Sequence, residues 1–261
     1  MNIKNNKVAY FSLLLATTLF VGCGGSSSSG PSKNSGTGNI DLANYFPNKD
    51  MSKTFSTVEG NTTDLNSGSY EENIAVTTEN NITTITTIDD GDIEKILISD
   101  KNITQISDDI NFSTYRHVNL GDTFFKIEKE STQDINKSGF HYAKVTSKVK
   151  LECTIEEQLK NFTKGEHKYS GDLLKIKCIN NGEVIIDIAP NLIALAPESF
   201  KDINGSHTNY DISYAYMKKD IGGIAIIDDD CIVNSTEPKS QDDRKTECIE
   251  KHYDYEYYLG N

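Results

Sequence analysis

The feature that most constrains the fold is the alternation of apolar and polar residues between short clusters of Asn, Asp and Gly. It is clearest at residues 143–155, where Val149 and Leu151 fall on one face of an extended segment and Lys148 and Lys150 on the other. A period of two is typical of a β-strand with one buried and one solvated face, whereas an amphipathic helix has a period of 3.6. The alternation therefore predicts a mainly β protein, an antiparallel meander that forms a curved sheet or half-barrel.

Turn residues between the apolar runs predict hairpins, because Asn, Asp and Gly tolerate the left-handed backbone conformation that tight turns need. The predicted turns lie at residues 79–81, between strands 74–78 and 82–88, at residues 99–102, between strands 96–98 and 103–106, and at Asn181-Gly182, between strands 168–179 and 184–186. Two short helices are also predicted, at residues 155–162, where Ile155, Leu159 and Phe162 stand at helical spacing, and at residues 189–200.

The first 22 residues have the parts of a secretory signal peptide. Lys4 and Lys7 form a positive region, and an uncharged segment of 14 residues at positions 8–21 is too short to span a bilayer. The segment ends at Gly22-Cys23. It resembles the lipobox of bacterial lipoproteins, and this resemblance implies that residues 1–22 are removed and that Cys23 is acylated.

Residues 23–39 follow as the lipid anchor and a flexible tether, since positions 24–39 hold mainly Gly, Ser, Thr and Asn. Such a segment spans roughly 20 to 24 Å on average, which lifts a folded domain clear of the headgroups. Gly24 stands where inner-membrane lipoproteins often have Asp. The resemblance therefore implies attachment to the outer membrane, on its periplasmic or its cell-surface face.

The mature chain is strongly acidic, because loss of two lysines with the signal peptide changes the formal net charge from −13 to −15. Such a chain repels the phosphates of nucleic acids and of anionic lipids, so we expect no nucleic-acid partner and membrane contact through the lipid anchor. Residues 40–261 are long enough to bury about 70% of their unfolded surface, and we expect them to form one β-rich domain without a cofactor.

The mature chain has an even number of cysteines besides the anchor, which in an exported protein predicts two disulfides. They are Cys153, Cys178, Cys231 and Cys248. Three pairings are open to four cysteines. A hairpin turn at residues 165–166 places Cys153 opposite Cys178 on the apolar face, which favours the pairs Cys153–Cys178 and Cys231–Cys248. A zinc site is not predicted, because C-x-x-C spacing and a histidine pair are both missing from the sequence.

Catalytic motifs are not found in the sequence. The five histidines are scattered, and neither H-E-x-x-H, nor G-x-S-x-G, nor a glycine-rich phosphate loop occurs. Acidic clusters at residues 89–92 and 228–230 lack the spacing of an EF-hand loop, and we interpret them as charged turns between strands. We therefore expect a protein that is not an enzyme and that holds no metal.

Eight N-x-S/T sequons occur, and six carry Asp or Glu two residues before the Asn, where 39 acidic residues in 261 would give about one by chance. The six are Asn61, Asn81, Asn102, Asn111, Asn136 and Asn204. The pattern resembles the extended sequon read by the periplasmic oligosaccharyltransferase of some bacteria, which implies N-linked glycans. Asp-x-Asn-x-Thr is also favourable turn chemistry, so the sequence leaves both interpretations open.

Three patches, at residues 119–124, 169–175 and 214–227, together resemble a β domain of uncharacterised bacterial lipoproteins. The resemblance covers residues 45–258 and implies a curved antiparallel sheet similar to that of periplasmic lipoprotein carriers. This chain has Phe124 where the family usually has Trp after Gly-Asp. The resemblance assigns no catalytic residue.

A curved sheet often encloses an apolar groove. The sequence therefore favours a non-enzymatic, lipid-anchored envelope lipoprotein that binds a lipid or another hydrophobic ligand. The alternative is a surface-displayed structural or interaction protein whose Thr- and Asn-rich strands present a hydrophilic, N-glycosylated face. Neither hypothesis specifies a protein partner.

Overall fold

A computed structural model describes residues 38–61, 64–89, 92–106, 111–137, 140–190, 204–232 and 250–260. Within these ranges the chain forms fourteen strands and one four-residue 3-10 helix. The elements are β1 (Ile40–Asp41), η1 (Leu42–Tyr45), β2 (Met51–Asn61), β3 (Leu65–Glu79), β4 (Ile82–Asp89), β5 (Asp92–Ile98), β6 (Asn102–Ile106), β7 (Asn111–Tyr115), β8 (His117–Val118), β9 (Thr123–Lys137), β10 (Phe140–Lys164), β11 (His167–Ile188), β12 (Gly205–Lys218), β13 (Gly222–Ile232) and β14 (Glu250–Tyr258).

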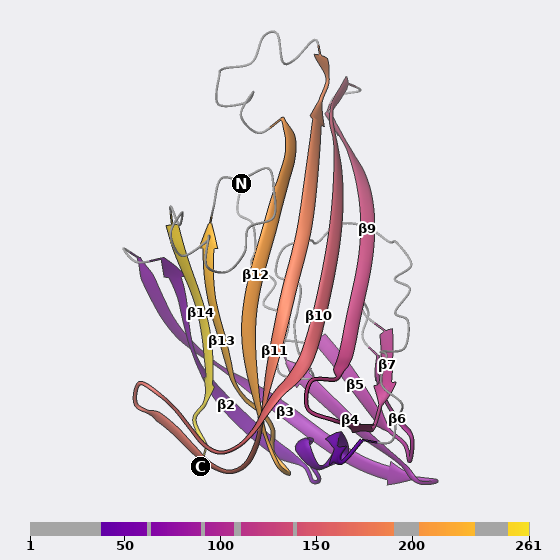
Figure 1. The fold of residues 1–261 in the computed structure, drawn as a ribbon, viewed down its shortest axis with the longest axis vertical. Coiled ribbons are helices and arrows are strands. Elements are labelled where there is room, and N and C mark those ends of the chain that lie inside the picture. The colour runs from indigo at the N-terminus through magenta and orange to yellow at the C-terminus, as the bar shows by residue number, and fades with distance from the viewer. Residues whose placement is uncertain are drawn as a thin grey trace.

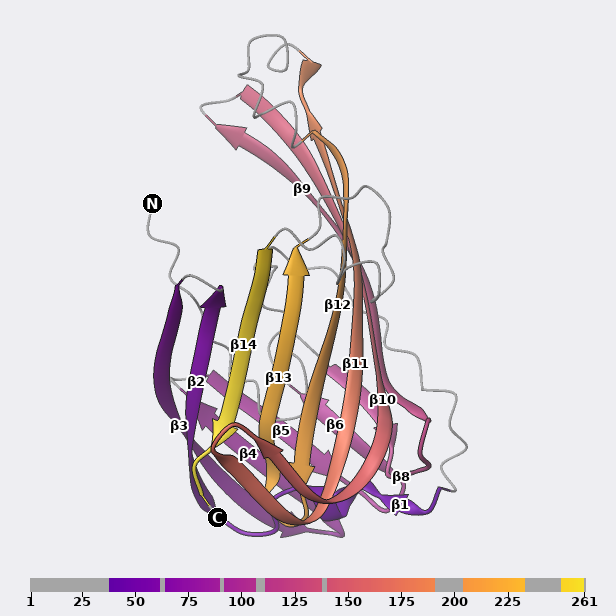
Figure 2. The ribbon, with the colours of Figure 1, turned by 60° about the vertical axis from the view of Figure 1, so that its left-hand side comes forward.

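Twelve of these strands form one antiparallel sheet in the order β7-β6-β5-β4-β3-β2-β14-β13-β12-β11-β10-β9, and β1 pairs with β8 separately. The sheet curls until its two terminal strands, β7 and β9, come into contact, so that it is nearly closed into a barrel (Figures 1 and 2). The mainly β, antiparallel, curved architecture is therefore confirmed. Closure depends on the pairing of β14 with β2, which joins the last strand of the chain to the first long one.

The hydrophobic core lies inside the barrel, because residues from opposite walls belong to one buried cluster. Ile85 and Ile96, from β4 and β5, share this cluster with Leu151 and Ile176, from β10 and β11. The turns that join β3 to β4, β5 to β6, β10 to β11 and β12 to β13 all lie at one end of the barrel, together with η1. We call it the plugged end, because Leu42 and Tyr45 of η1 are buried there, and we call the opposite end the far end.

Four neighbouring strands extend beyond the rest of the barrel at the far end (Figures 1 and 2). β10 and β11 have 25 and 22 residues, whereas β13 and β14 have 11 and 9. We call this projection the blade and define it as residues 128–137, 140–149, 180–188 and 205–213 of β9 to β12.

Three of the predicted hairpin turns are confirmed. Glu79 pairs with Ile82 across the first, and Asn80 and Asn81 adopt the positive φ angles of 51° and 63° that the turn needs. Ile98 pairs with Ile103 across the second, and Lys164 with His167 across the third. The alternation at residues 143–155 also places the predicted face inside, with Leu151 2% exposed.

The helix predicted at residues 155–162 is wrong, because this segment is extended within β10. Two register shifts explain the apolar spacing that suggested it, one between Ile155 and Glu157 and one between Leu159 and Asn161. Such bulges change which face a side chain occupies. Ile155 accordingly lies in the barrel core, while Leu159 and Phe162 pack on a second cluster outside the barrel.

The hairpin turn predicted at Asn181-Gly182 is also wrong, because both residues lie inside β11. They pair with Lys150 and Val149 of β10 on one side and with Tyr210 and Asn209 of β12 on the other. Pairing with two neighbouring strands thus overrides the local turn preference. The second predicted helix, at residues 189–200, falls outside the described residues after Pro190.

The tip of the β10–β11 hairpin folds over the outer face of β12 and β14, as Figure 2 shows. Phe162 stacks on Tyr216 with ring centroids 3.8 Å apart, and the Tyr169 hydroxyl donates a hydrogen bond of 2.7 Å to the carbonyl oxygen of Tyr258. Burial here raises the pKa of Tyr216. The bulged hairpin therefore forms a second apolar cluster, on the outside of the barrel.

Candidate functional site

The inside of the barrel is the natural place to look for a ligand site, and its plugged end is occupied by the first residues of the domain. Ile40 pairs with Val118, and Leu42, Tyr45 and Phe46 are buried in the barrel core. Core side chains of both walls, from Ile74 to Met217 along the chain, pack against them. We call residues 40–46 the plug.

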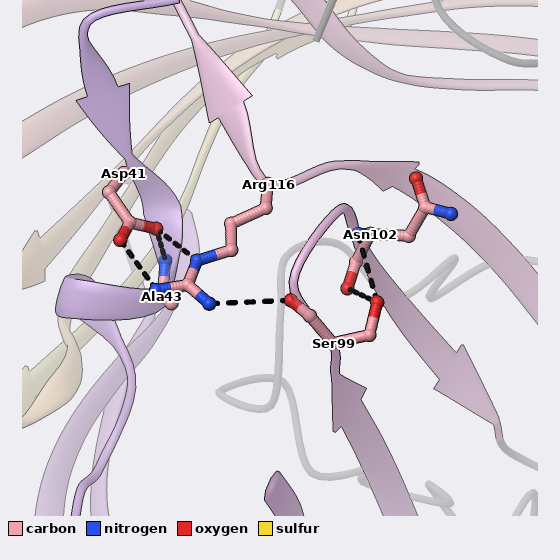
Figure 3. Close-up of polar contacts among 5 residues, drawn as sticks. All are labelled: Asp41, Ala43, Ser99, Asn102 and Arg116. Atoms are coloured by element: carbon pink, nitrogen blue, oxygen red, sulfur yellow. Dashed lines mark hydrogen bonds and ion pairs between the residues drawn. The ribbon is translucent and has the colours of Figure 1, made fainter. Parts of the chain in front are cut away.

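An ion pair ties the plug to the barrel (Figure 3). Arg116 Nε and Nη2 donate to the two carboxylate oxygens of Asp41, each at 2.7 Å, and the Ala43 amide donates to Asp41 Oδ1 at 3.1 Å. Arg116 Nη1 reaches the carbonyl oxygen of Ser99 at 3.4 Å. Burial acts to raise the pKa of Asp41, but the hydrogen bonds from Arg116 and from the Ala43 amide, together with the charge of Arg116, outweigh it, so the pKa lies below its usual value. The bidentate geometry holds the plug in one orientation.

A buried lysine lies beneath the plug. Lys53 of β2 and Glu72 of β3 are cross-strand partners, each 1% exposed, and Lys53 Nζ donates to the Gly223 carbonyl oxygen at 3.2 Å. Burial lowers the pKa of Lys53 to about 8, although the charge of Glu72 opposes this shift. Gly222 adopts φ +88°, a backbone conformation that strains other residues, and a Cβ there would also crowd Pro47 at 3.1 Å and Lys53 Nζ at 3.2 Å.

Aromatic and acidic side chains surround Lys53. Its Nζ lies 5.7 Å from the ring centroid of Phe55 and 6.0 Å from that of Tyr258, and the Tyr70 hydroxyl donates to Glu256 at 3.1 Å. A buried amine with a lowered pKa is typical both of active sites and of structural polar networks. Because Lys53 and Phe55 are 1% and 0% exposed, a substrate has no access to the amine, and we assign it a structural role.

Above this cluster, an acidic wall faces the barrel interior. Ser213, Asp228, Asp254 and Glu59 are successive cross-strand partners on β12, β13, β14 and β2. They share a face with Ala215 and Ile226, which pack into or against the barrel core. Asp228 is therefore part of a strand, and the prediction that residues 228–230 form a turn is wrong. Within the described residues no three metal-ligating side chains converge on one point.

The inner face of the blade is mixed: β10 and β11 contribute apolar side chains, whereas Gln133 and Ser131 of β9 lie opposite Val145 and Ser147 on the same face. Val145 and Val149 of β10 and Val184 and Ile186 of β11 lie on this face and are half-buried. A separate open depression of about 380 Å³ is lined by Asp50, Met51, Asn73, Ile74, Ala75 and Ile88. Of these surfaces, the apolar stripe on the inner face of β10 and β11 has the chemistry that a hydrophobic ligand requires.

The predicted disulfide between Cys153 and Cys178 is confirmed. The two residues are direct cross-strand partners, 0% and 1% exposed, and their sulfurs are bonded. The turn at residues 165–166 sets this register. Cys231 lies in β13, but its side chain and Cys248 are outside the described part of the chain, as is Cys23, so the second disulfide and the acylation site stay predictions.

The sequons lie at both ends of the barrel. Asn81 and Asn102 are exposed at hairpin turns of the plugged end, and Figure 3 shows the Asn102 side chain directed away from the turn contacts that Ser99 makes. Asn204 is exposed beside the blade, where its Oδ1 accepts a hydrogen bond of 2.8 Å from the Ile188 amide. The other three predicted sites lie at the far end of the barrel: Asn61 at the end of β2, Asn111 at the start of β7 and Asn136 near the end of β9.

Sequence reasoning missed the Lys53–Glu72 pair, although a signal was present. Both residues stand in the apolar phase of their strands, Lys53 between Met51 and Phe55 and Glu72 two residues before Ile74. A Lys and a Glu in the inward phase of consecutive strands predict a buried pair.

No family model matches the chain, and neither a curated protein nor a solved structure is significantly similar to it. In the described part of the chain, no helix is long and apolar enough to cross a membrane. The resemblance to bacterial lipoproteins stays a prediction that rests on the sequence patches named above.

Proposed function

We propose that the chain is a non-enzymatic, lipid-anchored lipoprotein of the outer membrane that acts as an interaction protein. The observation that carries this proposal is the position of the plug. Residues 40–46 directly follow the predicted tether and fill the plugged end of the barrel. A tether that joins the domain there turns the plugged end toward the membrane and presents the blade away from it.

The barrel interior supports this role over that of a lipid carrier. An acyl chain at the plugged end would have to displace side chains that are already packed, at a cost in buried apolar contact. Further along, it would lie against Asp228 and Asp254, and burying carboxylates against hydrocarbon is unfavourable.

A hydrophobic ligand is the second candidate, and one observation favours it. The half-buried Val145, Val149, Val184 and Ile186 line the inner face of the blade. Lipid that co-purifies with the protein, identified by mass spectrometry of an organic extract, would support this candidate. Substituting Val149 and Val184 with Thr should then reduce the amount of bound lipid.

Protease treatment of intact cells tests the proposed role. Cleavage of the protein at the cell surface supports display to external partners, whereas protection until the outer membrane is opened places it in the periplasm. A Cys23→Ala variant is the matched control, because it should lose the anchor and be released from the membrane.

N-linked glycans at four of the six sites would fit the same orientation, since Asn61, Asn111, Asn136 and Asn204 lie at the far end, whereas Asn81 and Asn102 lie at the plugged end. The intact mass of the natural protein tests this: an unmodified polypeptide mass refutes glycosylation. Asp100→Ala separates the two interpretations of the sequon at Asn102, because it removes the acidic residue and keeps Asn-x-Thr intact. Loss of one glycan from this variant would support recognition of the extended sequon.

A further inference from the structure

β9 has one edge without a partner strand among the described residues. It is a terminal strand of the sheet and pairs only with β10. β7, at the other end of the strand order, has five residues against 15 in β9, and Figure 1 shows it beside the lower part of β9. Residues 128–137 therefore present a row of backbone amides and carbonyls at the edge of the blade, where another strand can add.

Charges on the outer face of the blade form an ordered ladder. Glu128, Glu130 and Asp134 of β9 lie opposite Lys150, Lys148 and Lys144 of β10. On the other side of β10, Lys148 pairs with Glu183 of β11 at 3.1 Å, and Lys144 lies opposite Asp187. The face therefore has an acidic column, a basic column and a second acidic column.

The ladder predicts what a strand added to β9 would need. Opposite charges directly across a strand pair are favourable and like charges are unfavourable. Glu128, Glu130, Thr132 and Asp134 are all exposed on the outer face of β9. A neighbouring strand therefore fits best when it places Lys or Arg at alternate positions on this face.

A second copy of the chain fits poorly. An antiparallel β9–β9 pair centred on any residue from 128 to 132 brings at least two acidic side chains opposite each other, whereas one centred on Gln133 places Asp134 opposite Thr132 and Glu130 opposite Asn136. Centring on Glu130 pairs this residue with its own copy, and centring on Ser131 pairs Glu128 with Asp134. Within residues 128–137 no register sets an acid opposite a base, because the acids stand at even positions and the two lysines at odd ones, so a second copy offers no charge complementarity.

We propose that the β9 edge of the blade binds an extended segment of a partner protein that carries basic residues at alternate positions. Backbone hydrogen bonds along β9 supply the pairing, and the acidic column sets the register and orientation. The inference deepens the proposed interaction role and rests on it.

The test uses the mature acylated protein in detergent micelles and a fluorescent peptide of about ten residues in which Lys and Thr alternate. Controls are a peptide with the same residues in two blocks, a peptide with Glu in place of Lys, and the alternating peptide with methylated backbone nitrogens. We expect the alternating peptide to bind at least about tenfold more tightly than each control. Hydrogen exchange should slow in residues 128–137 on binding.

A triple variant, Glu128→Lys, Glu130→Lys and Asp134→Lys, should reverse the preference toward the Glu peptide. The matched control changes three exposed acids of the plugged end, Glu79→Lys, Asp100→Lys and Glu166→Lys, and alters the net charge equally. It should leave affinity for the Lys peptide within about twofold. Equal binding of the block and alternating peptides, or no protection of β9, overturns the proposal.

Dimerisation through β9, seen as protection of residues 128–137 that rises with protein concentration, would also overturn the proposal. The protease and peptide experiments distinguish failure of the proposed surface display from failure of the proposed strand addition. A protein cleaved on intact cells that binds no peptide refutes only the β9 edge. A protein that binds the peptide but is protected from protease supports the edge and refutes surface display.

Discussion

The buried lysine gives the sharpest prediction, a rise in stability at alkaline pH. Burial holds the pKa of Lys53 at about 8 in the folded state, against 10.5 for the unperturbed group. Between these values the unfolded chain binds a proton that the folded chain does not, so the free energy of unfolding increases with pH. Below pH 8 the lysine is charged in both states, and folding carries the full cost of burying the charge.

The magnitude follows from the two pKa values. The difference between 10.5 and about 8 corresponds to about 3.4 kcal/mol, and about 2 kcal/mol of this is regained between roughly pH 7 and pH 9.5. Burial raises the pKa values of Tyr169 and Tyr216, which acts in the opposite direction above about pH 10, when the unfolded tyrosines lose their protons. The measurement therefore stays below that range.

The assay is urea unfolding of the mature protein in detergent at the two pH values, compared with a Lys53→Met, Glu72→Gln double variant. The wild type should gain about 2 kcal/mol relative to the double variant on going from roughly pH 7 to pH 9.5. Lys53→Met alone should destabilise by about 3 kcal/mol near neutral pH, because it leaves Glu72 buried without its counter-charge. A difference that is flat or falls with pH would refute the reasoning.

Three further perturbations test other contacts. Replacing Cys153 and Cys178 by Ala should lower the free energy of unfolding by about 3.5 kcal/mol, since the disulfide closes a loop with a sequence separation of 25. The variant should be as stable as the reduced wild type. A variant as stable as the oxidised wild type would contradict this prediction. Asp41→Asn should cost about 1 to 2 kcal/mol and speed hydrogen exchange in residues 40–46; unchanged exchange there would contradict the plug. Phe162→Ala should cost about 2 kcal/mol and speed tryptic cleavage at the tip of the β10–β11 hairpin, whereas equal cleavage would show that the ring stack does not hold the tip.

Local patterns predicted much of the fold because they act within one hairpin. The alternation at residues 143–155 gives the strand and its inward face, and Asn80 and Asn81 give the turn. The register that pairs Cys153 with Cys178 follows from the turn position, because the two register shifts between the turn and the cysteines offset each other. Each of these features depends on residues close in sequence, where periodicity and turn chemistry are informative.

The same patterns failed where neighbouring strands decided the outcome. Asn181-Gly182 has strong turn chemistry, yet β10 and β12 hold it extended from both sides. The apolar residues between Ile155 and Phe162 have helical spacing because two bulges switch the strand between clusters. A bulge leaves little trace in a single sequence, since it is defined against the partner strand.

The sequence by itself determined that this protein is an acidic, antiparallel β protein and which faces of its strands are apolar, and it favoured the Cys153–Cys178 pairing that the structure contains. Only the tertiary structure decided that the sheet nearly closes, that the plug fills one end, and that Lys53 and Glu72 are buried there. These features need contacts between distant residues, such as the hydrogen bond from Tyr70 to Glu256 across 186 positions. Periodicity specifies which side of a strand is apolar, but the partner of that side is set by the closure of the whole sheet.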